Sequence, residues 1–209
     1  MTNGTHPRPA RTAEPVRGIV AAPFLAMFPD QSIDYETTAR YLGWIARQAP
    51  TAIAMNMDAS EGPALDRDEQ LAVLETAKRA IRGACPLVSG LIAGSTRDAV
   101  RFGRELAAAG AEALAIFPPF PTFLGKPVPG EMIERYHRAI AEGVGLPMIA
   151  FQFPVAFGPD FPPDTLARLA SIPEIIGLKE ASFDTTRTIE TIEAARALPR
   201  RLGILTGSD

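Results

Sequence analysis

The chain has one cysteine, two histidines and three lysines among its 209 residues, and each shortage narrows what the protein can be. A lone cysteine, Cys85, cannot form an intramolecular disulfide or a zinc finger, and its place before Pro86 at a strand entry predicts a small buried apolar side chain. Neither histidine belongs to a group with metal-ligand spacing, so we expect no metal and no other cofactor. His137 lies in a polar helical stretch, and we expect it to be solvated.

An excess of charge of one sign is also missing. The net charge is −3, and the arginines are scattered among stretches rich in Asp and Glu, which argues against a nucleic-acid partner. The chain has no run of about 18 apolar residues that would cross a membrane. Residues 1–16 are polar and proline-rich and lack the apolar core of a secretory signal, which predicts a disordered tail and a cytoplasmic protein.

From residue 17 onward, short apolar runs alternate with amphipathic stretches. The runs lack polar alternation, as strands buried on both faces do. The amphipathic stretches have the pattern of helices, and we expect Asp34, Ser95 or Thr96, Asp164 and Asp184 to act as helix N-caps. The predicted strands are 18–22, 52–55, 87–91, 113–117, 148–151, 175–179 and 203–206, and the clearest helices are 35–48, 66–82 and 96–109.

Strands that alternate with helices predict an α/β fold with a parallel sheet. The glycine fingerprint of a dinucleotide-binding fold is absent, which favours a TIM (β/α)₈ barrel over a doubly wound sheet. Such a barrel has eight strands and typically about 250 residues. The chain stops just past the seventh strand, so we expect residues 17–209 to form a barrel without its eighth strand and C-terminal helical region. Either the sequence is a fragment, which we favour, or a partner supplies the missing part.

One of the three lysines, Lys179, stands at the end of the apolar run 175–178. Burial favours the neutral amine, which is the nucleophile that forms a Schiff base with a carbonyl compound. A strand-end lysine whose ammonium simply reaches water is an equally good interpretation of this segment alone.

The surrounding motif favours the chemical interpretation. The segment Gly177-Leu178-Lys179-Glu180-Ala181-Ser182 closely resembles the Schiff-base lysine segment of the dihydrodipicolinate synthase / N-acetylneuraminate lyase family. Three further segments fall where that family has its Thr-Pro-Phe turn after strand one, its Gly-Thr-Thr-Gly-Glu loop after strand two and its Tyr-Asn-x-Pro segment at the end of strand five. They are Ala22-Pro23-Phe24, Met57-Asp58-Ala59-Ser60-Glu61 and Phe151-Gln152-Phe153-Pro154.

This resemblance covers residues 17–209 and implies a TIM-barrel lyase or aldolase of the class I type. Lys179 would form an imine with pyruvate or another small 2-keto acid. The resemblance also implies a homo-oligomer for the full-length protein. Gly207 and Asp209 resemble the segment after strand seven that contacts substrate hydroxyls in the lyase branch.

Four departures from the family pattern bear on the activity. The strand-five tyrosine that shuttles protons is Phe151, and a phenyl ring cannot donate or accept a proton. The segment after strand four, residues 117–120, also lacks its tyrosine. The loop's second threonine is Ala59, and the synthase's substrate arginine aligns with Ala156. We therefore expect an activity other than dihydrodipicolinate synthase proper, with Phe151 beside the substrate.

The loop after strand two offers replacements. Asp58 stands where the family has a relay threonine, and a carboxylate there can act as general acid or base if burial tunes its pKa. A solvated aspartate that accepts a backbone N–H is the alternative. We expect the Ser60 hydroxyl, or the backbone N–H groups of Ala59 and Ser60, to hold the keto acid's carboxylate.

Three other functions stay open at this point. A hydro-lyase acting on a keto-deoxy sugar acid would use the same imine to eliminate water. A non-catalytic family member would bind a keto acid or only assemble with partners, and the loss of both tyrosines favours it. Outside the family, a TIM-barrel enzyme that binds phosphate would need a glycine-rich loop after strand seven or eight.

Overall fold

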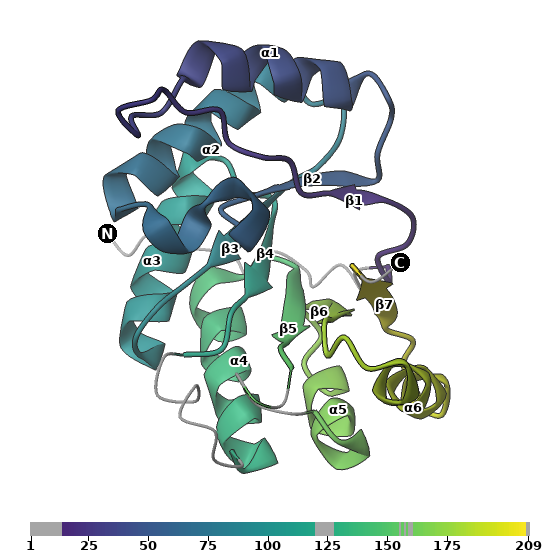
Figure 1. The fold of residues 1–209 in the computed structure, drawn as a ribbon. Coiled ribbons are helices and arrows are strands. Elements are labelled where there is room, and N and C mark those ends of the chain that lie inside the picture. The colour runs from purple at the N-terminus through teal and green to yellow at the C-terminus, as the bar shows by residue number, and fades with distance from the viewer. Residues whose placement is uncertain (1–13, 120–127, 155, 157, 159–160, 208–209) are drawn as a thin grey trace, which may run out of the picture.

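The computed structural model describes residues 14–119, 128–154, 156, 158 and 161–207. Within these residues, seven parallel strands form one sheet in chain order, and Figure 1 shows the sheet curling into an open barrel with the helices outside it. The strands are β1 (Val20–Ala21), β2 (Ala52–Met55), β3 (Leu87–Leu91), β4 (Ala113–Ile116), β5 (Met148–Gln152), β6 (Ile175–Glu180) and β7 (Gly203–Thr206).

Each strand is followed by a helix before the next strand begins, as a parallel sheet requires. Two short 3₁₀ turns, η1 (Asp58–Ser60) and η2 (Gly62–Ala64), lie between β2 and its helix. The helices are α1 (Tyr35–Ala46), α2 (Arg67–Ile81), α3 (Thr96–Ala109), α4 (Gly130–Val144), α5 (Pro163–Ala170) and α6 (Thr185–Arg196). None of the helices in the part of the chain that the structure describes is long and apolar enough to span a bilayer.

The predicted TIM-barrel arrangement is confirmed, and most element bounds agree with it. Asp34, Ser95 and Asp184 each accept a backbone N–H three residues further on, so these N-caps are confirmed. The Asp164 cap is wrong, because α5 already begins at Pro163 and Asp164 lies in its first turn. β1 is shorter than predicted, since only Val20 and Ala21 pair with β2.

Side chains on the two faces of the sheet form two separate apolar layers. The larger layer lies between the sheet and the helices, and it includes Leu42, Leu74 and Ile140. The smaller layer fills the inside of the barrel, and its members include Ala54, Val88, Ala115, Ile149 and Phe151. Because successive side chains of a strand point to opposite faces, the second layer shows which residues face the barrel interior.

The packed part of the chain begins before the boundary expected from the sequence. Val16, which was assigned to the tail, donates its N–H to the carbonyl of Ile176 at 3.2 Å. Its backbone lies against Gly203, where an added Cβ would come within 2.0 Å of the Val16 carbonyl oxygen. Val16 therefore crosses the amino ends of β6 and β7, and Gly203 permits this close approach.

Two predictions about single side chains had different outcomes. Cys85 is buried with 8% exposure, as expected. His137 is only 3% exposed, so the prediction of a solvated histidine is wrong. The reason is its place in α4, four residues after Ile133 and three before Ile140, because residues at these spacings share one helix face and both isoleucines are buried.

Candidate active site

Lys179 lies on β6 with its side chain toward the barrel interior. It pairs in register with Phe151 on β5, so the two side chains stand on the same face of neighbouring strands. Its ammonium nitrogen lies 3.8 Å above the centre of the Phe151 ring. Lys179 is partly exposed, whereas Glu180 beside it on the strand is buried on the opposite face. The sequence therefore places a lysine at the carboxyl end of a barrel strand, where TIM barrels hold their active sites.

The surroundings of Lys179 favour its neutral amine. Burial lowers the pKa of Lys179, and the Asp58 carboxylate opposes this shift by favouring the ammonium form. The face of the Phe151 ring also favours the ammonium, by cation–π attraction. Within the described part of the chain, the amine forms no salt bridge, so no carboxylate is bound to it directly. The amine is thus free to attack a carbonyl group.

The wall beside Lys179 consists of aromatic rings. Phe151 is 2% exposed and stacks on Phe153, with ring centres 4.4 Å apart. Phe117 meets Phe151 edge-on at 4.9 Å between ring centres. None of these three rings carries a hydroxyl group, so this wall excludes water from one side of the amine but moves no proton.

Polar groups fix the end of β6 from the side that faces the helices. The Glu180 carboxylate accepts hydrogen bonds from the Ser182 N–H at 2.9 Å and from the Thr188 hydroxyl at 2.6 Å. The Gln152 amide donates a further bond to Glu180 at 3.5 Å and accepts the Phe161 N–H at 3.2 Å. A buried carboxylate with these partners locks the strand end that carries Lys179, and both Gln152 and Glu180 have structural roles here.

The loop after β2 carries Asp58 and Ala59. Ser60 closes this loop on itself, because its hydroxyl accepts the Met57 N–H at 2.9 Å and donates to the Met57 carbonyl at 3.3 Å. The Ser60 N–H also donates to that carbonyl, at 3.1 Å. The hydroxyl and N–H groups of Ser60 were expected to hold the substrate's carboxylate. In the structure, both are used for hydrogen bonds within this turn. The N–H groups of Asp58 and Ala59 stand at the start of η1 and have no hydrogen-bond acceptor within it.

Asn56 anchors the same loop, and sequence reasoning missed it. Its side-chain amide donates to the Ser89 hydroxyl at 3.0 Å and to the Gln70 carbonyl at 3.2 Å. Its backbone is left-handed, with φ of 55°, and is enclosed by Gly62 and Gly90. A Cβ on Gly90 would lie 2.0 Å from the Asn56 carbonyl oxygen, so only glycine fits.

Gln70 on α2 completes this anchor. Its side-chain amide donates to the carbonyl groups of Gly62 at 3.0 Å and Leu65 at 3.1 Å, and so holds both ends of η2. The sequence did contain one signal for this arrangement. Ser89-Gly90 interrupts the buried strand β3, and a glycine inside a strand often marks the close approach of another backbone.

A model of the dihydrodipicolinate synthetase family matches residues 15–209. The chain belongs to this family. The resemblance seen in the Lys179 segment is thereby confirmed. The 4-hydroxy-tetrahydrodipicolinate synthase of Methylibium petroleiphilum is 29% identical over 197 residues, which make up 94% of this chain and 64% of that protein. The enzyme of the same name from Thiobacillus denitrificans is 30% identical over 194 residues, or 92% of this chain and 63% of that protein.

A solved structure gives the same picture of the fold. The chloride-inhibited dihydrodipicolinate synthase from Acinetobacter baumannii, complexed with pyruvate, superposes with a TM-score of 0.81 and 28% identity. The superposition covers 91% of this chain and 63% of that one. This chain therefore spans slightly less than two thirds of the length of these family members.

Two further residues that the family resemblance singled out lie after β7. Gly207 directly follows the strand and is exposed. Asp209 lies outside the described residues. Among the described residues, no group of three histidine, cysteine, aspartate or glutamate side chains can hold a metal ion.

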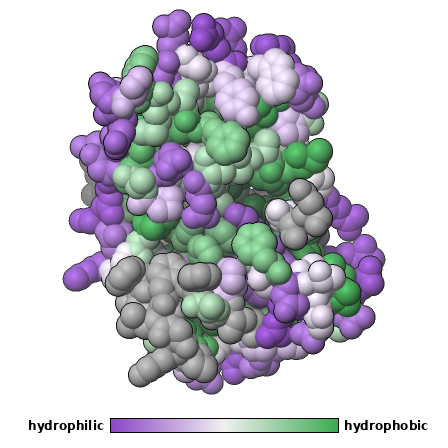
Figure 2. Space-filling view, viewed as in Figure 1, coloured by the Kyte–Doolittle hydropathy of each residue, from purple (hydrophilic) through white to green (hydrophobic). Residues whose placement is uncertain are grey.

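Exposed aromatic rings surround the carboxyl ends of the strands. Phe24 follows β1 and is 73% exposed, and Phe183 follows β6 and is 70% exposed. Phe183 has a left-handed backbone with φ of 55°, which is uncommon for a bulky residue. Figure 2 shows apolar side chains gathered across the middle of the face it draws, with hydrophilic ones around them.

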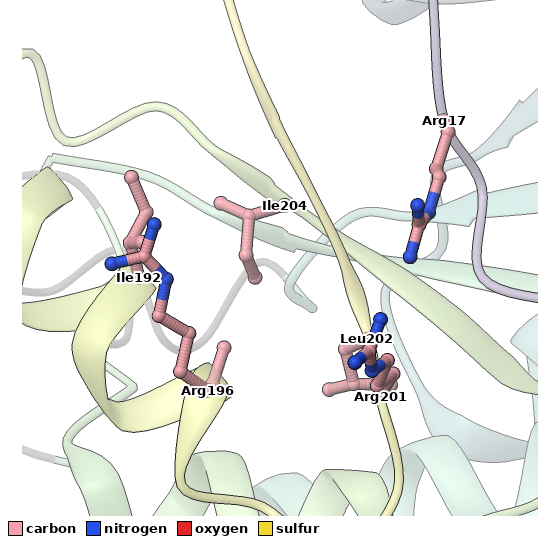
Figure 3. Close-up of a pocket in the computed structure, with 7 residues that line it drawn as sticks. Arg17, Ile192, Arg196, Arg201, Leu202 and Ile204 are labelled. Carbon is pink, nitrogen blue, oxygen red and sulfur yellow. The ribbon is translucent and has the colours of Figure 1, made fainter.

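A separate cavity of about 480 Å³ lies at the opposite ends of the strands, beside the free edge of β7. Figure 3 shows Arg17, Arg196 and Arg201 around it, together with apolar side chains from α6 and β7. None of the predicted site residues lines this cavity. It therefore takes no part in chemistry at Lys179.

Proposed function

We propose that Lys179 forms a Schiff base with pyruvate or a related 2-keto acid, and that the protein is a lyase or aldolase of the class I type. The observation that supports this most directly is the Lys179 amine itself. It is partly buried, has a lowered pKa and no salt-bridge partner in the described part of the chain, and points into the barrel at the carboxyl end of β6. Membership of the dihydrodipicolinate synthetase family supports the same chemistry.

The proposed reaction begins when the neutral amine attacks the C2 carbonyl of the keto acid. Uptake of one proton and loss of one water molecule then leave a protonated imine, which withdraws electrons from the neighbouring carbon. Removal of a proton from C3 gives an enamine, and C3 then forms a bond to the carbonyl carbon of an aldehyde, whose oxygen takes up a proton. Hydrolysis of the imine returns the amine and releases the product. The reverse sequence cleaves the same carbon–carbon bond.

Asp58 is proposed as the group that takes and returns the C3 proton. It stands on η1 at the carboxyl end of β2, and its charge acts on Lys179. Phe151 lies closest to the amine among the aromatic rings but has no proton to give, so a carboxylate from the neighbouring loop is needed for the transfer. The keto acid's carboxylate would be held by the N–H groups of Asp58 and Ala59, since the Ser60 hydroxyl and N–H are engaged within the turn.

The second substrate is proposed to differ from that of the synthase. The wall formed by Phe117, Phe151 and Phe153 presents no hydroxyl groups beside Lys179, and the position after the strand-five proline holds Ala156 rather than an arginine. Such a site suits an aldehyde without a carboxylate better than one that carries a negative charge. Gly207 and Asp209 are proposed to contact this second substrate. Assembly of the full-length protein as a homo-oligomer belongs to the same proposal.

Exchange of the C3 protons of pyruvate for deuterium tests the proposal without knowledge of the second substrate. In D₂O, an enzyme that forms the enamine replaces the methyl protons of pyruvate, and proton NMR follows their loss. Lys179→Met should abolish this exchange, and Asp58→Asn should slow it at least tenfold. Glu61→Gln serves as the control, because it removes a charge from the same loop without touching the proposed relay. Exchange that persists in Lys179→Met would refute the proposal, and tight pyruvate binding without exchange would favour a non-catalytic binder.

A further inference from the structure

A second cavity, of about 110 Å³, lies behind α4 and includes none of the residues proposed for the reaction. Its lining comes from α4, from the segment after β4, from the first turn of α3 and from the segment before α5. Most of the side chains around it are apolar or aromatic, among them Pro118, Met132, Ile133, Tyr136 and Phe161. Met132 is 52% exposed, so it forms a rim that opens to solvent.

One polar side chain in this lining, His137, is almost completely buried. Its Nδ1 lies 2.8 Å from the Ile133 carbonyl oxygen, one turn back along α4. A carbonyl oxygen can only accept, so Nδ1 carries the ring proton and Nε2 is a bare acceptor. Burial lowers the pKa of His137 to about 4, which keeps the ring neutral at physiological pH.

Among the residues that the structure describes, none forms a hydrogen bond with Nε2 of His137. His137 lines the cavity and its Nδ1 is bound to the helix backbone, which leaves Nε2 as the ring nitrogen that a ligand in the cavity can meet. The neighbouring Tyr136 hydroxyl is not its donor, because it donates to the Phe117 carbonyl at 3.4 Å. A buried acceptor without a partner destabilises a protein, and such groups are uncommon in native structures.

We propose that this cavity binds a small, mainly apolar molecule with one hydrogen-bond donor, of the aryl alcohol class, whose hydroxyl donates to His137 Nε2. The cavity is smaller than the apolar protein cavity of about 150 Å³ that binds benzene, but it opens to solvent at the Met132 rim, so a ligand can extend past its enclosed volume. A bound water molecule explains the site less well. Buried waters generally have two to four polar partners, whereas most of the side chains around this cavity are apolar.

Phenol and benzene are matched probes for this site, since they differ by the one hydroxyl group that the proposal requires. Titration of each into the protein, followed by NMR, gives two affinities. The nitrogen shift of His137 Nε2 in a long-range proton–nitrogen spectrum reports directly on the new hydrogen bond, and His6 supplies an internal reference signal. We expect phenol to bind about tenfold more tightly than benzene and to move the Nε2 signal, whereas benzene leaves it nearly unchanged.

Two variants complete the test. His137→Phe keeps a flat ring but removes the acceptor, so phenol should lose its advantage while benzene still binds. Met132→Trp leaves His137 intact and closes the rim, so both probes should bind at least tenfold more weakly. It also keeps the proposal testable if His137→Phe does not fold.

Three results would overturn the proposal. They are equal affinities for the two probes, an Nε2 signal that phenol does not move, and a crystal soaked in phenol that shows only water at Nε2. The site is independent of Lys179, so deuterium exchange in pyruvate and binding of phenol can succeed or fail separately.

Discussion

Replacement of Asp58 by asparagine should change the pH at which Lys179 reacts as well as the rate of turnover. The Asp58 carboxylate favours the ammonium form of Lys179 and thereby opposes the effect of burial on the Lys179 pKa. Asparagine keeps the shape of the side chain and removes its charge. The pKa of Lys179 should therefore fall further below its ordinary value, and a larger fraction of the amine should be neutral at any given pH below that pKa.

The exposure of Asp58 limits the size of this shift. Two unit charges 4 Å apart attract each other by about 1 kcal/mol in water and about 4 kcal/mol at an effective dielectric constant near 20. Asp58 is exposed, and among the described residues it forms no salt bridge with Lys179, so the attraction lies toward the lower figure. We therefore expect the pKa of Lys179 to fall only modestly, because solvent screens the charge of the exposed Asp58 carboxylate.

Borohydride trapping of pyruvate across a pH series measures this shift. The midpoint of imine formation by Asp58→Asn should move to lower pH, whereas turnover should be lost because the proposed proton acceptor is absent. Glu61→Gln should leave both the midpoint and the turnover near those of the unaltered protein. The reasoning is refuted if Asp58→Asn has the same midpoint as Glu61→Gln, or if it turns over at the full rate.

Three other changes test separate parts of the structure. His137 has a pKa of about 4 in the folded protein and about 6.5 in the unfolded chain. Its contribution of about 3 kcal/mol to the free energy of unfolding is therefore present above pH 6.5 and is lost as the pH falls toward 4. Urea unfolding at several pH values should show this loss of stability, and His137→Phe should make the stability less dependent on pH. Arg200 donates to the Ala170, Ile172 and Ile175 carbonyl groups at 2.8–2.9 Å, so Arg200→Ala should lower the free energy of unfolding by about 2–4 kcal/mol, with little recovery in Arg200→Lys. Phe151→Tyr should speed C3 exchange in pyruvate by placing a hydroxyl near Lys179, and an unchanged NMR rate would contradict the role given to the missing tyrosine.

Much of the barrel could be predicted from the sequence because its strands are buried on both faces. The predicted bounds of β2, β3 and β7 agree with the structure in full. The helix starts at Asp34, Ser95 and Asp184 could be predicted, because these residues have short side chains that accept backbone N–H groups. β1 was too long in the prediction, because an apolar composition does not show how many residues find a pairing partner.

The site was predictable where one residue type carries the chemistry and harder to predict where backbone contacts shape it. Lys179 stood out as a rare lysine at the end of an apolar run. The role of Asn56 depends on contacts across 14 and 33 residues of sequence, which its local pattern does not contain. Ser60 looked like a ligand for substrate, but its hydroxyl is used by the turn. His137 looked solvated because its neighbours are charged, whereas the helix turns its side chain inward.

Borohydride reduction in the presence of pyruvate, followed by intact mass and peptide mapping, tests the central claim most directly. The account predicts one added pyruvyl group, located on Lys179, and none in Lys179→Met. The 68–82 and 120–127 regions carry the other two lysines, Lys78 and Lys126, and these provide an internal measure of nonspecific reaction. A folded protein that gives no adduct, or an adduct spread over all three lysines, would contradict Schiff-base chemistry at Lys179.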